Sequence, residues 1–265
     1  MKKILLSIAL CASVLMVKAQ DPVTFEEGGF KYEVTDAVGL KVKIVDNYYA
    51  SKDYVLVSEV THEEATYQVT EVGDYAFTNC GITSVVIPDG IEVIGEQAFS
   101  GNGLTEVTIP GSVKTISVNA FRQNSQLASV TLNEGLESIG NYAFLNLSLL
   151  TTITLPSTLT TLDNAFMGCV GLTKVVSKIQ TPTAISFDTF PSSVYDNSTL
   201  EVPAGTKTAY EAVDCWRRFQ NIVESSATAI NNTAAGVRSV KRIVNGQLII
   251  ERDGKIFNAT GAEVK

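Results

Sequence analysis

A repeated arrangement of apolar residues dominates the middle of the chain. Between successive repeats the apolar positions follow the order apolar-x-x-apolar-x-apolar, as in Leu104, Val107 and Ile109. Two residues separated by one lie on the same face of a strand, so we expect Val107 and Ile109 to point inward and Thr108 outward. Each repeat also contains an Ala-Phe pair, and successive pairs are 22, 22, 23 and 22 residues apart: 76–77, 98–99, 120–121, 143–144 and 165–166.

This periodicity predicts a repeat solenoid that is mainly β, with short helical turns. A unit of about 22 residues cannot bury its own apolar face, so successive coils must stack and place equivalent residues above one another. We therefore expect an internal aromatic ladder of Phe77, Phe99, Phe121, Phe144 and Phe166. Gly73, Gly95 and Gly140 precede the Ala-Phe turn, where we expect backbone freedom to be needed.

Two capping regions are expected beside the repeats. Residues 20–68 alternate apolar and polar positions, which indicates short strands that form an N-terminal β cap. The solenoid and its C-terminal cap occupy residues 69–224. We expect this cap to contain a short helix near 208–219 and to close the core with Trp216, Phe219 and Ile222.

The two ends of the chain carry different signals. Residues 1–19 combine a basic start, an apolar run and a small-residue exit, which predicts a cleavable signal peptide. The run of about 14 apolar residues is shorter than the ~20 needed to span a bilayer, and no later segment is long enough. Residues 225–236 are rich in Ser, Thr, Ala and Asn, which indicates a linker. Residues 237–265 form a predicted β-hairpin tail that turns at Asp253-Gly254.

Composition excludes several classes of function. The net charge is −8, and removal of Lys2, Lys3 and Lys18 leaves 17 basic against 28 acidic residues, or −11, so nucleic acid is not an expected partner. The chain has one histidine, His62, which is too few for a typical zinc site or a Ser-His-Asp triad. We therefore expect no catalytic residues, no metal, no cofactor and no enzymatic activity.

The mature chain keeps three cysteines, Cys80, Cys169 and Cys215. Cys80 and Cys169 lie four units apart, which at ~4.8 Å per stacked strand is about 19 Å and too far for a disulfide. A bridge between Cys169 and Cys215 remains open, although three free thiols are favoured.

The repeats resemble the leucine-rich repeats of the BspA-like surface proteins, whose consensus is close to V-x-x-I-G-x-x-A-F-x-x-C-x-x-L-x-x-V-x-I-P. The resemblance covers about 110 residues. Cys80 and Cys169 occupy the consensus cysteine position, which Asn102, Asn124 and Leu147 take in the other units. The resemblance implies a secreted or cell-surface protein that adheres to host matrix proteins or other cells, and the similarity of the C-terminal tail implies a Gram-negative bacterium. The tail is similar to small modules that sort or anchor exported proteins; a β appendage packed on the cap is the alternative.

The candidate binding surface lies on outward positions of the regular strands. Thr is also a favourable solvent-facing strand residue, so the pattern alone permits a merely solvated surface, and the resemblance favours recognition. We expect a non-enzymatic protein that recognises an extracellular protein or glycan, in adhesion. A structural envelope-associated scaffold without a host ligand is the alternative, a hydrolase is the third reading, and the oligomeric state is open. The two outward columns are Val86, Thr108, Thr131, Thr154 and Val176, and Ser84, Glu106, Ser129, Thr152 and Lys174.

Overall fold

The structure, a computed structural model, describes residues 21–47 and 52–225, and the backbone of 239–244, 247–252, 255–257 and 263–264. The chain divides into two units, residues 1–225 and 226–265. The predicted signal peptide, the predicted linker from residue 226 onward and the Asp253-Gly254 turn lie outside the described residues.

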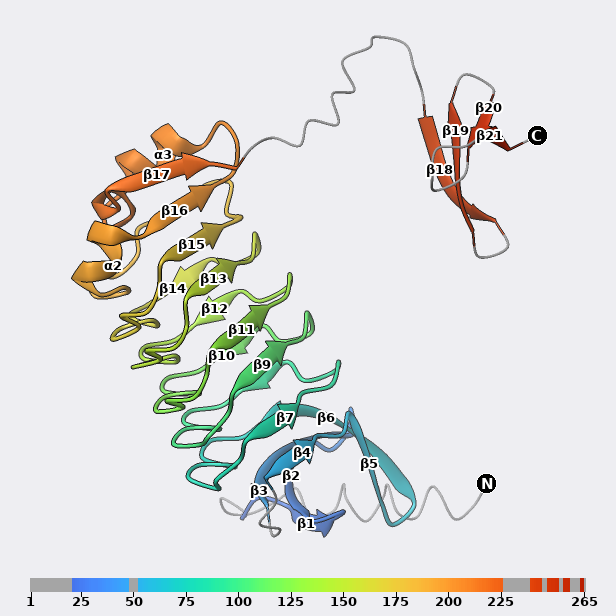
Figure 1. The fold of residues 1–265 in the computed structure, drawn as a ribbon. Helices are drawn as coiled ribbons and strands as arrows, with labels where there is room; N and C mark the ends of the chain where they lie inside the picture. The colour runs from blue at the N-terminus through green and yellow to red at the C-terminus, as the bar shows by residue number, and fades with distance from the viewer. Residues whose placement is uncertain are drawn as a thin grey trace. The chain divides into compact units, whose positions relative to one another are not determined.

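Regular strands stack in parallel along the solenoid, as Figure 1 shows. In β9, Val107 and Ile109 are buried and Thr108 is exposed, which confirms the predicted alternation. Backbone ladders join β4 to β7, β9 to β11, and β13 through β15 and β16 to β17. The strands of this column are β4 (Asp53–Val55), β7 (Ser84–Val86), β9 (Glu106–Ile109), β11 (Ser129–Leu132), β13 (Thr152–Leu155), β15 (Lys174–Ser177), β16 (Thr199–Val202) and β17 (Asn221–Glu224).

A second parallel column runs beside the first and consists of two-residue strands. It continues into the N-terminal strands, because β8 pairs with β6 and β6 pairs in parallel with β3. Parallel stacking thus already includes strands within residues 20–68. The short strands are β8 (Val93–Ile94), β10 (Thr115–Ile116), β12 (Ser138–Ile139) and β14 (Thr161–Leu162); the N-terminal ones are β1 (Thr24–Glu27), β2 (Phe30–Asp36), β3 (Lys41–Asn47), β5 (Glu59–His62) and β6 (Ala65–Val72).

The aromatic ladder forms as predicted. Successive rings are nearly parallel, with centroids 5.2–5.5 Å apart, and all are buried. The ladder has a sixth ring, Phe190, which sequence reasoning missed because Thr189 stands where the other units have alanine. The spacing of 24 residues from Phe166 was the available signal. At the other end, Phe30 of the N-terminal strands meets Phe77 edge-on at 6.0 Å, so aromatic rings close both ends of the stack.

The turn glycines have a different cause from the one expected. Gly73, Gly95 and Gly140 do not have positive φ angles. A Cβ on Gly95 would lie 2.7 Å from the backbone nitrogen of Asp74 in the preceding coil, so close stacking of coils favours glycine there. The left-handed residues instead lie two positions before four of the ladder phenylalanines, at Tyr75, Gln97, Asn119 and Tyr142, and two positions after five of them, at Asn79, Gly101, Gln123, Asn146 and Gly168.

The consensus cysteine position is a hydrogen-bonding site in this protein. Asn124 is fully buried, and its Nδ2 donates to the carbonyl oxygens of Phe99 and Phe121, both at 2.9 Å. Asn102 makes the equivalent bonds one coil earlier, to Phe77 and Phe99. Polar side chains at this position therefore tie together the backbone of neighbouring turns, a role that goes beyond filling space.

The three cysteines are free thiols with different surroundings. Cys169 is buried and its Sγ donates to the carbonyl oxygen of Phe144 at 3.0 Å, whereas Cys80 and Cys215 are half-buried. Burial raises the pKa of the Cys169 thiol to about 12, so its reactive thiolate is nearly absent at pH 8.

We expect alkylation to separate these thiols. When residues 20–265 react with iodoacetamide at pH 8, Cys80 and Cys215 should be labelled well before Cys169, because a buried protonated thiol is a poor nucleophile. Peptide mass spectrometry over time measures the three rates, and the urea-unfolded chain serves as the control in which the rates converge. Equal labelling rates of the three cysteines in the folded protein would contradict the burial of Cys169.

The C-terminal cap closes the core as predicted, but its helix is shorter than expected. The helix α3 (Lys207–Ala212) ends before Val213, which is extended, and Cys215 is left-handed at φ 70°, so the expected helix near 208–219 is wrong beyond residue 212. A separate 3-10 turn, η1 (Trp216–Arg218), follows, and α2 (Ser192–Asn197) lies earlier in the cap. Trp216, Phe219 and Ile222 are buried.

The C-terminal unit is a four-stranded antiparallel sheet in the order β18-β19-β20-β21. Arg252 pairs with Lys255, which confirms the hairpin strands around the predicted turn. The strand β18, which sequence reasoning did not separate, pairs along the whole of β19. The strands are β18 (Ser239–Val244), β19 (Gln247–Arg252), β20 (Lys255–Phe257) and β21 (Glu263–Val264).

Candidate recognition surface

The backbone register brings the predicted outward residues together in columns. Because strands β9 and β11 pair without a shift, Thr108 lies opposite Thr131 and Glu106 opposite Ser129. The pairing of β13 with β15 likewise places Thr154 opposite Val176 and Thr152 opposite Lys174. Ser84 and Val86 occupy the same positions on β7, the preceding regular strand (Figure 1). We call the outward side of strands β4 to β15 in this column the long-strand face.

Exposure decreases toward the C-terminal end of this face. The candidate residues on β7, β9 and β11 are exposed, as is Thr152. Thr154, Lys174 and Val176 are half-buried. The first part of the long-strand face is therefore the part most open to a partner.

The face carries little charge, and its charges differ in their surroundings. Lys174 Nζ lies 2.8 Å from Glu201 Oε2 on the neighbouring strand, which neutralises the C-terminal end. Glu106, in contrast, has no ion-pair partner among the described residues.

Sequence reasoning missed the outward residues at the N-terminal end of this face, where Asp53 lies opposite Ser84 and is exposed. Val55 on β4 lies opposite Val86, and the exposed fractions of these two side chains are 69% and 52%. Val57 follows with 38% exposure, while Tyr54 and Leu56 are buried. The alternation in residues 54–57 was the available signal, but these residues were assigned to a cap rather than to the stack.

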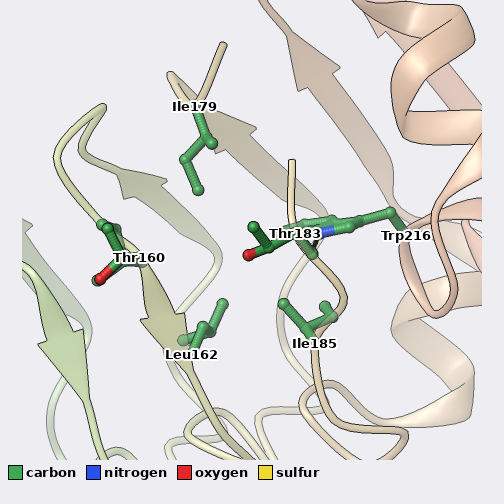
Figure 2. Close-up of a pocket in the computed structure, with 7 residues that line it drawn as sticks. Thr160, Leu162, Ile179, Thr183, Ile185 and Trp216 are labelled. Carbon is green, nitrogen blue, oxygen red and sulfur yellow. Dashed lines mark hydrogen bonds between the residues drawn. The ribbon is translucent and has the colours of Figure 1, made fainter. Parts of the chain in front are cut away.

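A small cavity lies beside the C-terminal cap, as Figure 2 shows. Its volume is about 10 Å³, enough for about one water molecule. Trp216 Nε1 donates to the carbonyl oxygen of Thr183 at 2.9 Å, which anchors the indole at its edge. No carboxylate lines this cavity, so it offers no acid pair for hydrolysis: it is lined by Leu159, Thr160, Leu162, Ile179, Thr183, Ile185 and Trp216.

Other candidate chemistry is sparse in the part of the chain that the structure describes. No cluster there of three or more His, Cys, Asp or Glu side chains could hold a metal ion. The ring of His62 stacks on Phe25 at 4.3 Å, and its Nδ1 lies 3.8 Å from a carboxylate oxygen of Glu27, so His62 has a packing role in the N-terminal strands. Within the same described residues, no helix is long and apolar enough to cross a membrane.

Comparisons with known proteins agree with this architecture. The sequence pattern described as "BspA type Leucine rich repeat region" matches residues 58–201 in six copies, more than half of the chain. A crystal structure of a leucine-rich repeat protein of T. pallidum is 20% identical with a TM-score of 0.52, and the match covers 74% of this chain and 94% of that one. The pneumococcal vaccine antigen PcpA is 19% identical with a TM-score of 0.48, over 69% of this chain and 65% of that one. No curated protein matches the sequence.

The stacked parallel coils and the matched repeats define a leucine-rich repeat solenoid. The chain belongs to the BspA-type leucine-rich repeat family. Members of this family are bacterial surface proteins, and the family suggests a protein-binding role.

Proposed function

We propose that this protein is secreted or displayed on the surface of a Gram-negative bacterium and that its long-strand face recognises an extracellular protein or glycan, in adhesion. The observation that carries this proposal is the exposed and nearly neutral set of outward side chains on β7, β9 and β11, of which those on β9 and β11 are in register. The family's surface location and the predicted signal peptide support export.

The first test is binding of residues 20–265 to an array of extracellular-matrix proteins and glycans. We expect at least one saturable interaction, and we expect it to be lost in the variant Thr108→Lys/Thr131→Lys/Thr154→Lys, because three lysines place long charged side chains along the centre of the face. Biolayer interferometry measures the affinity, and circular dichroism verifies that the variant is folded.

A matched control is Thr115→Lys/Thr161→Lys, which places lysines on the short strands β10 and β14. This variant should bind as the unmodified protein does. Equal loss in both variants would contradict the assignment of the face. Absence of any binding across the array would favour the alternative function, a structural scaffold in the envelope.

A further inference from the structure

The N-terminal end of the long-strand face is its apolar part. Val55 and Val86 are direct register neighbours and are more than half exposed, and Val57 extends the patch along the chain. Farther along the same column, Thr108 and Thr131 replace valine. Threonine has nearly the same shape as valine and would be better solvated at positions 55 and 86. The exposed valines there therefore offer an apolar contact to a partner.

A carboxylate lies beside this apolar patch. Glu106 is on β9, the next strand of the column, and belongs to the same outward column as Ser84. Some carboxylates of the solenoid have lysine partners: Glu137 lies 3.6 Å from Lys114, and Glu134 lies 3.2 Å from Lys178. Glu106 has none among the described residues, so its charge is available to a partner's cation. The acidic net charge of the chain also attracts a basic partner.

The dimensions of the face favour an extended segment over a second folded domain. The exposed valines and Glu106 lie on or beside three neighbouring strands, β4, β7 and β9, which together span about 10 Å at ~4.8 Å per strand. A stable interface between folded proteins buries about 800 Å² per partner. The face therefore fits a segment of a few residues better than a second copy of the chain.

We propose that the patch formed by Val55, Val57, Val86 and Glu106 binds an extended segment of a partner protein that presents an apolar side chain next to a lysine or arginine. The apolar side chain packs on the valines, and the cation pairs with the Glu106 carboxylate. This inference rests on the proposed recognition function and names the chemistry of the partner.

The test is selection of a random 12-residue peptide library, displayed on phage, against immobilised residues 20–265. We expect the selected pool to be enriched in Lys or Arg close to Val, Ile or Leu. The most enriched peptide, made synthetically, should bind Glu106→Gln about two- to tenfold more weakly, as for an exposed ion pair. Val86→Thr should weaken it by a similar factor because one methyl group is replaced by a hydroxyl. Added salt should weaken binding to the unmodified protein by a larger factor than binding to Glu106→Gln, because the ion pair adds to the attraction by the chain's net charge.

Two matched variants serve as controls. Val170→Thr changes a valine that is 61% exposed outside the regular strands, and Glu137→Gln changes a carboxylate on the loop before β12. Both should bind the peptide as the unmodified protein does.

Three results would overturn the inference. One is a pool without basic enrichment, the second is equal affinity for Glu106→Gln, and the third is failure to select any peptide. If non-basic peptides are selected and the three-lysine variant loses them, only this inference fails and the recognition function stands. If no peptide is selected and the matrix and glycan array also shows no binding, both fail.

Discussion

Replacement of Phe121 with alanine is expected to lower the free energy of unfolding by about 3–5 kcal/mol. Phe121 is fully buried, and its ring lies between those of Phe99 and Phe144, with centroids 5.3 Å and 5.4 Å away. Loss of the ring removes contacts with both neighbouring coils and leaves a cavity that the repetitive backbone cannot easily fill. Because each coil contacts only its neighbours, the weakened interface lies between the two halves of the solenoid.

Thermal and urea unfolding of residues 20–265 measure this effect. The expected decrease in Tm is roughly 10 °C for a domain of this size. Phe187→Ala is the matched control, because it deletes the same atoms from a ring that is 65% exposed. That ring contacts the Arg218 guanidinium at 3.9 Å, so its loss should cost about 1 kcal/mol or less. Similar destabilisation by both variants would show that the stacked rings of the ladder do not contribute specially to stability.

Replacement of Asn124 with alanine is expected to cost about 2–4 kcal/mol, because buried backbone groups lose their hydrogen-bond partners. The side chain accepts from the Leu104 amide through Oδ1 and donates to the Phe99 and Phe121 carbonyls. In the next coil the equivalent residue is Leu147, whose side chain has no hydrogen-bond donor. The Phe121 carbonyl therefore cannot gain a replacement bond from that coil.

Asn102 and Asn124 share one acceptor, and this predicts a coupling between them. Both donate to the Phe99 carbonyl, at 2.9 Å in each case. Either single alanine variant therefore leaves that carbonyl with one partner, and only the double variant leaves it with none. We expect the double variant to lose about 1–2 kcal/mol more than the sum of the two single losses.

A double-mutant cycle by urea unfolding measures the coupling. Asn133→Ala is the control, since Asn133 is exposed and should change stability by less than about 0.5 kcal/mol. Additive losses within about 0.3 kcal/mol would show that the shared carbonyl is not the source of coupling.

Much of the fold could be predicted because the Ala-Phe pair occurs in five successive units at a nearly constant spacing. The Ala-Phe spacing predicted the ladder, and the alternation in Val107, Thr108 and Ile109 predicted which side chains point inward. Phe190 escaped prediction because its coil replaces the preceding alanine with threonine. The helix near 208–219 was overestimated because Val213 is extended and Cys215 is left-handed, and neither conformation leaves a signal in the apolar pattern.

The sequence by itself determined the solenoid, its family and the inward and outward sides of each regular strand, because local alternation and a constant repeat length leave few ways to bury the apolar residues. Only the tertiary structure decided which outward residues become neighbours, since that depends on the register between strands distant in sequence. It placed Val55 opposite Val86 across 31 residues and left Glu106 without a cation among the described residues. It also showed that glycine is favoured at these turns because a Cβ there would collide with the backbone of the adjacent coil. That contact forms only when the coils stack.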